Sequence, residues 1–559
     1  MPSKIAALVD ARAQSTEDAG RPAYIDSQSG SVLTWGDVRA AAGRWREAAR
    51  SAGLAPGTPV ALAVSEPLAF IGAYLGLLSA GAVVLTLDPF AMPVSSGAEG
   101  DGTGGTGRRD AAALAEAAAA LGEFTATGVV TDGAGGRRAA EEAGVPAWGL
   151  SVAGPDPGAL SAPARGAGDR RPAPWAEPST VVLRTSGSTG RPKGVPLQER
   201  LLLHNASAVV GHHRLGPAER MHSALPLFHI NAQVTGVLSA LVAGSSLVIA
   251  DRFHRNGFWD VLGGWEVTVL NAVPAILTLL AEGSPPPDSV RDRVRFARSA
   301  SAPLPVATLA AFQERCGIGV LETYGMTEAA GQICASPLAP ELRRPGSVGL
   351  PVGIELQVVD ERGRPVPAGE EGAVEIRGPS VTTAYITPAE GGTSPSRRIA
   401  RKPSGWLATG DVGFADHAGF VVLLGRVDGV INRGGEKVYP REVEEVLLRH
   451  GGVAAAAVVG EPDPVLGERP VALIVRKEQI PGDLAAFESD LLALCRRELT
   501  RHKQPARIDV VDRLPSTATG KVRRDQLKAM VSGSTPGSPA PAKPAPAKPA
   551  PANSNPTPA

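Results

Sequence analysis

The chain contains 559 residues, 43% of them apolar, which is enough for three or four units with buried cores and excludes a largely disordered chain. Its 56 basic side chains balance its 56 acidic ones, so the net charge gives no argument for a nucleic-acid partner or an acidic membrane. The three cysteines, Cys316, Cys334 and Cys495, are widely spaced, which indicates reduced thiols in a cytoplasmic protein and argues against disulfides or a zinc site.

The N-terminal region is predicted to alternate helices and strands. The apolar stretch before Asp10 is too short for a signal peptide and is expected to be helical. A hairpin is predicted at residues 23–26 and 32–34, followed by an amphipathic helix that starts at Thr34. A buried strand is predicted at residues 59–64.

Residues 69–87 form a run of nineteen residues without a charge, nominally long enough to cross a bilayer. Glycines interrupt this run, so we predict a buried helix, a glycine stop and a core strand, and no membrane span. The pattern of residues 78–88 returns at residues 241–251, where a helix end, a glycine, a buried strand and an aspartate again follow one another. This weak repeat predicts two α/β layers of related build.

Two stretches rich in small residues interrupt these patterns. Residues 95–109 contain glycines at positions 102, 104 and 107, formally the spacing of a dinucleotide-binding fingerprint. No strand leads directly into this stretch, so it is predicted to be a flexible loop. Residues 154–178 are predicted to be a second connector, rich in Pro, Gly and Ala.

The pattern of predicted elements changes twice in the C-terminal part. From Ile354 short strands alternate with turn residues, which predicts a small β-rich unit that closes the large domain. Residues 426–530 alternate helix and strand patterns, as expected for a compact α+β domain. Within it, helices are predicted at residues 442–450 and 484–499, and strands at residues 453–459 and 471–475.

The predicted fold class is therefore α/β. We expect a large N-terminal domain of layered α/β subdomains at residues 1–425, which includes the β-rich unit, and a smaller α+β domain at residues 426–530. Residues 531–559 are mostly Pro, Ala and Ser and are predicted to be an extended, disordered tail, because they offer little apolar surface to offset the entropy of ordering.

A phosphate-binding loop is predicted in residues 181–195. A short β-branched run there leads into Thr185, Ser186, Gly187, Ser188, Thr189 and Gly190, and then Lys193. Glycines let successive backbone N–H groups converge on one anion, and the hydroxyls and the ammonium group add donors that suit a polyphosphate. The loop is not a Walker A motif, because Lys193 follows a proline and no Ser or Thr comes after it. A polar surface loop is the alternative on composition alone.

This loop resembles the phosphate loop of the adenylate-forming superfamily, which includes acyl- and aryl-CoA synthetases, luciferases and nonribosomal adenylation domains. Six further stretches resemble the motifs of that superfamily, in order, over nearly the whole globular chain. Residues 226–233 resemble the gate of its acid pocket, which implies that His229 orients the carboxylate; taken alone, a histidine near an apolar run is more often structural.

Two of these stretches are implied to hold the adenine and the metal. Residues 298–304 resemble the turn that flanks adenine, although Ser301 stands where most members have glycine; an ordinary strand-to-helix turn is the alternative. Residues 322–328 imply that Tyr324 stacks on adenine, Thr327 contacts the α-phosphate region and Glu328 holds Mg²⁺, the divalent cation that a triphosphate needs. Without that context, Thr327 and Glu328 would be a helix cap. The remaining nucleotide contacts implied by these two motifs are Ala302, Pro303, Glu322, Thr323, Gly325 and Met326.

The other three stretches are implied to hold the ribose and to carry the second half-reaction. Asp411 and Arg426 resemble the ribose-binding pair, although an aspartate is also common in turns. Residues 432–438, which include Arg433, Gly434 and Gly435, resemble the loop that lines the thiol tunnel, with a plain surface turn as the alternative. Lys521 matches the C-terminal catalytic lysine, although most lysines are simply solvated.

The resemblance implies an enzyme that activates a small or aryl carboxylic acid with ATP and Mg²⁺, and then passes the acyl group to coenzyme A. In the superfamily the smaller domain is mobile and swings about a hinge, which falls here at Asp428. Within the superfamily the chain resembles small-acid and aryl-acid CoA ligases, particularly enzymes of the oxalate–CoA ligase type, at residues 299–301 and 432–437. Arg298, Ser299, Asn231 and Gln233 would suit a second polar group on the acid, and residues 271–274 are predicted to form another wall.

Three alternatives remain at this point. The adenylate can pass to an amine or to the thiol of a separate carrier protein instead of coenzyme A. A variant of this chemistry adenylates an inorganic oxyanion such as nitrite and delivers it to an aryl amine. The third alternative is a binding module without activity, which the intact motif residues argue against.

Overall fold

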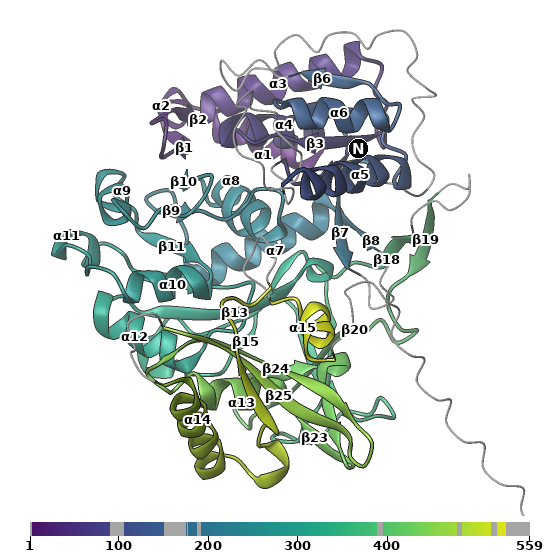
Figure 1. Cartoon of the computed structure of the whole chain (residues 1–559). Coiled ribbons are helices and arrows are strands. Elements are labelled where there is room, and N and C mark those ends of the chain that lie inside the picture. Colours follow the sequence, from purple (N-terminus) through teal and green to yellow (C-terminus); the bar gives the residue numbers. More distant parts are fainter. Residues whose placement is uncertain are drawn as a thin grey trace, which may run out of the picture.

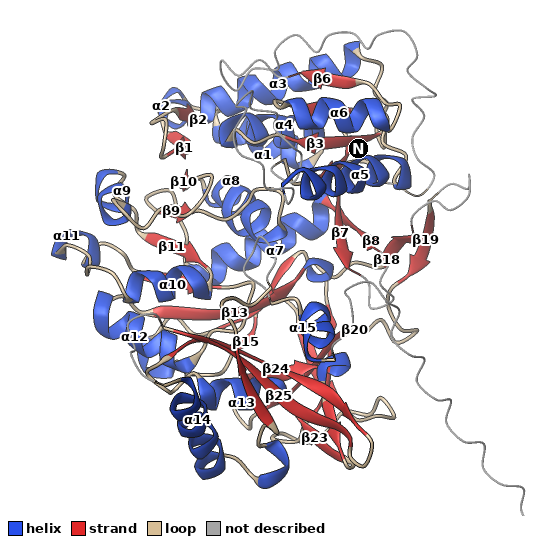
Figure 2. Cartoon of the chain, viewed as in Figure 1, coloured by secondary structure: helices blue, strands red, loops and turns tan. Residues whose placement is uncertain are grey.

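The computed structural model describes residues 3–89, 106–149, 175, 177–186, 192–387, 395–477, 483–515 and 522–532. Two large sheets and three layers of helices make up the N-terminal part, and a smaller sheet with its helices forms the C-terminal end of the molecule (Figure 1). Strands gather in the sheets and helices cover them, as the α/β prediction requires (Figure 2).

The first sheet has eight strands in the order β19-β18-β8-β7-β4-β3-β5-β6. Its strands are β3 Pro59–Ala63, β4 Val83–Thr86, β5 Val129–Thr131, β6 Ala147–Gly149, β7 Thr180–Ser186, β8 Pro192–Gln198, β18 Ala384–Thr387 and β19 Ser396–Ile399. Helices α5 Thr106–Glu123 and α6 Ala134–Glu142 belong to the chain segments between these strands. The central strands are parallel and the edge at β7, β8, β18 and β19 is antiparallel.

The second sheet has nine strands in the order β15-β14-β13-β12-β11-β9-β10-β1-β2. Its strands are β1 Pro22–Asp26, β2 Val32–Thr34, β9 Arg220–Ser223, β10 Ser246–Ile249, β11 Val269–Ala272, β12 Phe296–Ser299, β13 Val320–Met326, β14 Gly331–Ala335 and β15 Leu350–Pro351. Helices of this part are α1 Lys4–Arg12, α2 Thr16–Gly20, α3 Trp35–Ser51, α4 Pro67–Ser79, α7 Glu199–His213, α8 Ser239–Ala243, α9 Phe258–Gly264, α10 Pro274–Ala281, α11 Asp288–Arg291 and α12 Val306–Cys316. A π-helix, Asn231–Leu238, leads into α8, and short 3₁₀ turns lie at Thr327–Ala329 and Pro340–Leu342.

Alternation along the strands explains the layers. In β3, Val60 and Leu62 belong to the core between the two sheets, whereas Ala61 packs on the outer side with α5 and α6. In β10, Leu247 faces the same central core and Val248 faces the outer helices of the second sheet. Successive side chains of a strand point to opposite faces, so strands covered on both sides are continuously apolar.

The predicted repeat is present in the structure. Helix α4 ends at Ser79, Gly81 follows with a φ of +84° that favours glycine, and β4 begins at Val83. Helix α8 ends at Gly244, with φ of +68°, before β10. The two copies contribute one strand to each large sheet. The uncharged run at residues 69–87 is thus a buried helix and a strand, and no helix in the described residues is long and apolar enough to cross a membrane.

The β-rich unit is smaller than predicted. A four-stranded sheet contains β16 Glu355–Val359, β17 Gly372–Arg377, β20 Leu407–Ala415 and β21 Val421–Arg426. Strands β18 and β19 lie between them in the sequence but extend the first large sheet, because β18 pairs with β8. The predicted loop at residues 95–109 is also wrong at its end, since residues 106–109 form the first turn of α5; most of that stretch and most of residues 154–178 lie outside the described residues.

The C-terminal sheet begins directly after the β-rich unit. It contains β22 Ile431–Arg433, β23 Glu436–Val438, β24 Val453–Asp463, β25 Gly467–Arg476 and β26 Arg507–Val510. Helices α13 Pro440–Leu447, α14 Leu484–Glu498 and α15 Arg524–Val531 accompany it, with 3₁₀ turns at Val427–Gly429 and Arg501–Lys503.

Its hairpin of β24 and β25 is longer than the predicted strands. Glu461 faces Arg469 across the ladder, and it accepts from both Arg469 and Arg507 at 2.5 Å. These ion pairs let charged residues continue the strands. The predicted tail at residues 531–559 lies almost wholly outside the described residues.

Candidate active site

The predicted phosphate loop is the turn of a β-hairpin. Strands β7 and β8 pair antiparallel, with Thr185 opposite Lys193 and Ser186 opposite Pro192. The Thr185 hydroxyl is buried without a hydrogen-bond partner in the described part of the protein. An unsatisfied buried hydroxyl beside the loop fits a site that a ligand completes. Gly187, Ser188, Thr189 and Gly190 lie outside the described residues.

Lys193 and Glu328 meet although they are far apart in the sequence. The Lys193 Nζ lies 3.3 Å from Glu328 Oε1. Glu328 is 7% exposed and stands in the middle of the short turn that Thr327 begins, directly after β13. One carboxylate together with substrate phosphates is the usual way in which proteins hold Mg²⁺. The residues present therefore fit the predicted magnesium–triphosphate site.

Tyr385 of β18 completes this cluster and was not predicted. Its hydroxyl donates to Glu328 Oε1 at 3.3 Å, and the Lys193 Nζ lies 3.5 Å from the centre of its ring. Burial raises the pKa of the Tyr385 hydroxyl, so it stays protonated and acts as a donor. A tyrosine in a short strand looks like an ordinary core residue in the sequence, and only the strand pairing reveals its neighbours.

The predicted ribose pair is assembled with the predicted adenine-stacking tyrosine. Asp411 and Arg426 are direct partners across β20 and β21, and Arg426 Nη1 lies 3.2 Å from Asp411 Oδ1. The Tyr324 hydroxyl donates to the other oxygen, Asp411 Oδ2. Burial, with the Asp411 charge, raises the pKa of Tyr324 well above its usual range. Gly410 has a φ of +79°, and a Cβ there would lie 2.6 Å from Arg426, so glycine is required beside this pair.

The turn predicted to flank adenine lies between β12 and α12 and contains Ser301, Ala302 and Pro303. Ser301 has a φ of +71°, in the left-handed region that favours glycine. This backbone is consistent with the glycine that the resemblance implies at this position, and Ser301 adopts it here. The Ser301 hydroxyl accepts a hydrogen bond from Asn231 at 3.3 Å, which ties the turn to the predicted acid pocket.

Other residues of the 322–328 motif have contacts inside the protein. The Thr323 hydroxyl donates to the Ser299 carbonyl at 2.8 Å. A Cβ on Gly325 would lie 2.2 Å from the Gly331 carbonyl, so close backbone approach requires glycine. Met326 packs at the edge of a small core. Glu322 turns toward the C-terminal part, where Arg441 Nη2 lies 3.7 Å from its carboxylate.

Among the residues predicted to suit a second polar group on the acid, Arg298 is a buried cation. Arg298 is 3% exposed, and its Nη1 donates to Asn231 and Asn271, each at 3.0 Å. Its Nη2 donates to Gln332 at 3.4 Å, and its Nε has no hydrogen-bond partner among the described residues. No ion pair links Arg298 to a carboxylate among the residues that the structure describes. Burial lowers the pKa of Arg298 to about 9, so the group is still a cation at neutral pH.

His229 precedes Asn231 by two residues, and its ring is tilted against that of Phe228 with 4.4 Å between ring centres. Burial lowers the pKa of His229 to about 4. The ring is therefore neutral at pH 7 and can orient a carboxylate only by hydrogen bonding. Gln233 is fully buried and donates to Thr86 and Leu227, and its Oε1 has no partner in the part of the chain that the structure describes.

The predicted thiol-loop residues Arg433, Gly434 and Gly435 have no hydrogen bond or ion pair to this site in the described residues; Arg441 is the C-terminal side chain that pairs with Glu322. Arg433 donates to the carbonyls of Arg501, His502 and Gln504 at 2.8–3.3 Å. Gly434 and Gly435 form the turn between β22 and β23 with φ of +61° and +92°, as a tight hairpin requires. Lys521 lies outside the described residues.

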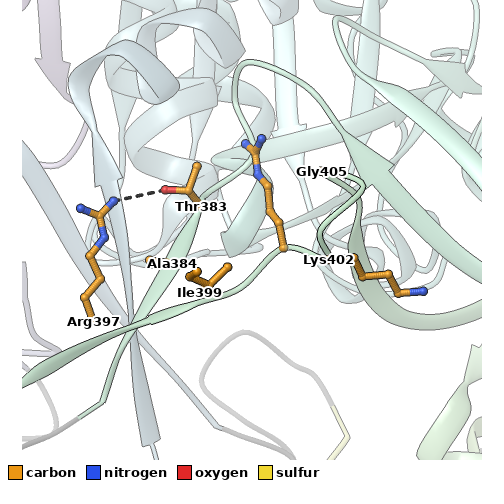
Figure 3. Close-up of a pocket in the computed structure, with 7 residues that line it drawn as sticks. Thr383, Ala384, Arg397, Ile399, Lys402 and Gly405 are labelled. Atoms are coloured by element: carbon orange, nitrogen blue, oxygen red, sulfur yellow. Dashed lines mark hydrogen bonds between the residues drawn. The ribbon is translucent and has the colours of Figure 1, made fainter.

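A separate surface cavity of about 460 Å³ lies beside β18 and β19 (Figure 3). Its cations are already engaged: Arg397 bonds Glu177 and Thr383 at 3.1 and 3.2 Å, and Lys402 pairs with Glu375. Arg401 donates to backbone carbonyls at residues 378–382. The described part of this cavity thus has no cation left for an anionic ligand.

Comparison with known proteins identifies the family. The model of the AMP-binding enzyme family matches residues 11–386, and that of the AMP-binding enzyme C-terminal domain matches residues 442–521. The chain belongs to the AMP-binding enzyme family. This confirms the predicted superfamily.

Relatives of known activity indicate the class of enzyme within this family. A sulfoacetate–CoA ligase of Cupriavidus necator is 37% identical over 528 residues, which cover 94% of this chain and 97% of the relative. An oxalate–CoA ligase of Arabidopsis thaliana is 36% identical over 348 residues, 62% of this chain and 66% of the relative. The crystal structure of ATP-bound MatB from Rhodopseudomonas palustris has a TM-score of 0.78 at 27% identity and covers 94% of this chain and 98% of that one. The predicted fold class and the predicted enzyme class, an acid–CoA ligase, are confirmed.

Proposed function

We propose that this enzyme activates a small carboxylic acid that carries a second anionic group, and transfers its acyl group to coenzyme A. Arg298 carries this proposal, because it is a buried guanidinium whose hydrogen-bond partners among the described residues are all neutral amides. Sulfoacetate and oxalate, which the two relatives take as substrates, both contain a second acidic group.

Arg298 has no negatively charged partner among the described residues. A buried cation loses its hydration, and neutral amides replace only part of that stabilisation. A ligand anion beside Arg298 would supply the rest, and such desolvated charge pairs discriminate strongly between ligands with and without the charge. Asn231 contacts both Arg298 and Ser301, so the second anion would lie close to the turn predicted to flank adenine.

Activation joins two anions and needs cations at the point of reaction. A carboxylate oxygen forms a bond to the α-phosphorus of ATP, the bond to the β-phosphate breaks, and pyrophosphate leaves. Mg²⁺ held by Glu328 would neutralise the phosphates, while Lys193 and Lys521 would stabilise the developing charge. Fixed charges of this kind need no reorganisation during the reaction. Asp411 and Arg426 would hold the ribose, and Tyr324 the adenine.

Transfer to coenzyme A follows when the thiol, after losing its proton, attacks the acyl carbon and AMP leaves. The two half-reactions would use two orientations of a C-terminal domain at residues 426–530 against residues 1–425, with Asp428 as the hinge. In support, the last strand of the β-rich unit ends at Arg426 and the C-terminal sheet begins at Ile431. Arg433, Gly434 and Gly435 would line the thiol path in the second orientation.

Lys521→Ala tests this division of labour. The substitution should abolish adenylate formation and leave the reaction of a supplied adenylate with coenzyme A largely intact, because the lysine acts only in the first step. Both half-reactions are measured separately on the same preparation. Equal loss of both would refute the assignment.

The acid is identified by ATP–pyrophosphate exchange with matched pairs of acids. Oxalate is compared with glyoxylate, and sulfoacetate with propionate, and coenzyme A, amines or a carrier-protein thiol are then added. We expect exchange with the doubly anionic member of a pair and thioester formation with coenzyme A. Equal exchange with the members that lack the second charge would overturn the proposed substrate class.

A further inference from the structure

Tyr385 connects the two groups on which the triphosphate site depends. Its hydroxyl reaches the Glu328 carboxylate, and its ring lies against the Lys193 ammonium group. The same carboxylate and ammonium also pair with each other at 3.3 Å. One side chain therefore contacts both the proposed metal ligand and the proposed phosphate ligand.

The strand pairing explains how Tyr385 reaches this position. Strands β18 and β8 are antiparallel, with Ile386 opposite Gly194. Those two residues face the outer core, where Ile386 is fully buried and a Cβ on Gly194 would lie 2.5 Å from Phe124. Tyr385 and Lys193 each lie one position away, so both point to the opposite face as diagonal neighbours.

The turn that precedes Tyr385 is fixed to the same two elements. The Thr382 N–H donates to the Glu328 carbonyl at 2.7 Å, and the Thr382 hydroxyl donates to the Pro196 carbonyl of β8 at 3.0 Å. Arg401 holds this turn from the other side through the carbonyls of Gly378, Val381 and Thr382. The start of β18 is thus a rigid support, on which elements of both large sheets converge.

We propose that Tyr385 is a positioning residue of the nucleotide site, which sets where the Lys193 ammonium and the Glu328 carboxylate stand when magnesium–ATP binds. This inference rests on the proposed roles of Lys193 and Glu328. Its physical basis is that a hydrogen bond to a carboxylate restrains that group, and that an ammonium group over an aromatic face is attracted to it. Binding of AMP does not need the restraint, because AMP lacks the β- and γ-phosphates and their metal.

The test compares Tyr385→Phe with Tyr385→Leu by calorimetric titration. Each variant is titrated with AMP alone and with magnesium and a non-hydrolysable ATP analogue. Tyr385→Phe removes the hydroxyl and keeps the ring, so the affinity for the magnesium complex should fall about fivefold to tenfold. Tyr385→Leu also removes the ring and should weaken that complex by roughly a further threefold. The affinity for AMP should stay within about twofold of the original protein in both variants, a margin well below the effect of one hydrogen bond to a charged group.

Tyr439→Phe is the matched control, because the Tyr439 hydroxyl also donates to a glutamate, Glu371, at 2.8 Å. It should change neither titration. In addition, the ATP exchange rate of Tyr385→Phe should need more magnesium for half-saturation while its KM for the acid stays unchanged. A purely structural role would instead weaken AMP and the magnesium complex alike.

Two further variants separate this inference from the proposed function. Lys193→Met and Glu328→Gln should both weaken the magnesium complex if the proposed site is right. If they do so and Tyr385→Phe does not, the role of Tyr385 is refuted while the site stands. If neither of them weakens the complex, the proposed site itself is wrong and the inference falls with it.

Discussion

The nucleotide side and the acid side of the site handle charge in opposite ways. On the proposed nucleotide side the charged groups among the described residues are paired: Lys193 faces Glu328, and Arg426 faces Asp411. On the acid side Arg298 is surrounded by amides, and no carboxylate pairs with it among the described residues. Under the proposed function, magnesium–ATP would exchange existing ion pairs for new ones, whereas the acid would add the opposite charge that Arg298 lacks among the described residues.

This difference in charge pairing indicates how ATP and the acid would each be recognised. An exchange of ion pairs is nearly balanced in energy, so affinity for ATP depends on the exact positions of the groups rather than on their number. Pairing of a ligand anion with the buried Arg298 is not offset by the loss of another ion pair. A ligand without the second charge leaves the guanidinium unpaired and gains none of this binding free energy. The acid side should thus determine specificity, and substitutions there should have the larger effects.

The largest effect is expected for Arg298→Met. Loss of the buried cation should lower kcat/KM for a doubly anionic acid about 10³-fold, which corresponds to about 4 kcal/mol. Acids with one carboxylate should react as well as before or better, because the site becomes apolar. ATP–pyrophosphate exchange over matched acid pairs measures both numbers.

Arg298→Lys is the control for this substitution, since it keeps the charge and loses the planar set of donors. It should retain a preference for the second anion at reduced rate. If Arg298→Met lowers the rate with all acids equally, Arg298 only supports the fold and the contrast between the two sides disappears.

A smaller effect is expected on the paired side. Glu328→Gln keeps an oxygen that can accept from Tyr385 but removes the charge that would hold Mg²⁺, so kcat should fall about 10²-fold. More magnesium should be needed for half-maximal rate, and the ratio of rates for doubly and singly anionic acids should not change. Glu47→Gln, at an exposed carboxylate paired with Arg50, should leave all three measurements unaltered. A changed acid preference in Glu328→Gln would show that the two sides are not independent.

The apolar patterns of the sequence were sufficient to predict the layers, and the resemblance to the superfamily was sufficient to predict the enzyme class. The buried strands at residues 59–63 and 83–86 and the helix between them follow from apolar patterns that tertiary packing only reinforces. The meeting of Tyr324, Asp411 and Arg426 followed from motif resemblance, although these residues belong to separate strands.

What the sequence could not indicate depends on long-range pairing. Strand β18 looks like part of the β-rich unit, and only its hydrogen bonds to β8 place Tyr385 beside Lys193. The sequence likewise contains Arg298 but cannot show that no carboxylate of the described residues reaches it. Whether a carboxylate lies beside Arg298 depends on how distant segments pack together, so no local sequence pattern predicts it.

Asp411→Asn should affect only ATP. The amide cannot pair with the Arg426 charge, and one of its two atoms no longer accepts, so KM for ATP should rise about tenfold. The KM of the acid should stay unchanged, because none of the hydrogen bonds of Asp411 connects it to Arg298 or its amides. Initial rates with each substrate varied in turn give both constants. A parallel rise in the KM of the acid would contradict the separation of the two sides.

The smallest effect is expected for Glu322. It is a buried carboxylate that has a cationic partner, whereas the buried Arg298 has only amide partners among the described residues. Burial raises the pKa of Glu322 to about 7 even though Arg441 lies beside it and acts in the opposite direction. A folded-state pKa above the ordinary value of 4.5 means that the folded protein binds the proton more tightly than the unfolded chain. The stabilisation is therefore complete below about pH 4.5 and is lost as the pH rises through about 7.

Glu322→Gln imitates the protonated form at every pH. The variant and the original protein should unfold at similar temperatures at pH 5, and the variant should unfold roughly 2–4 °C higher at pH 8. Thermal unfolding at several pH values measures this difference. Arg441 keeps Glu445 and the Leu423 carbonyl as partners in the variant, so it is not left without a contact. If the original protein is instead the more stable one at pH 8, the ion pair between Glu322 and Arg441 stabilises the fold by more than the burial of the Glu322 charge costs. Glu322 would then resemble Asp411 and Glu328, whose charges are paired.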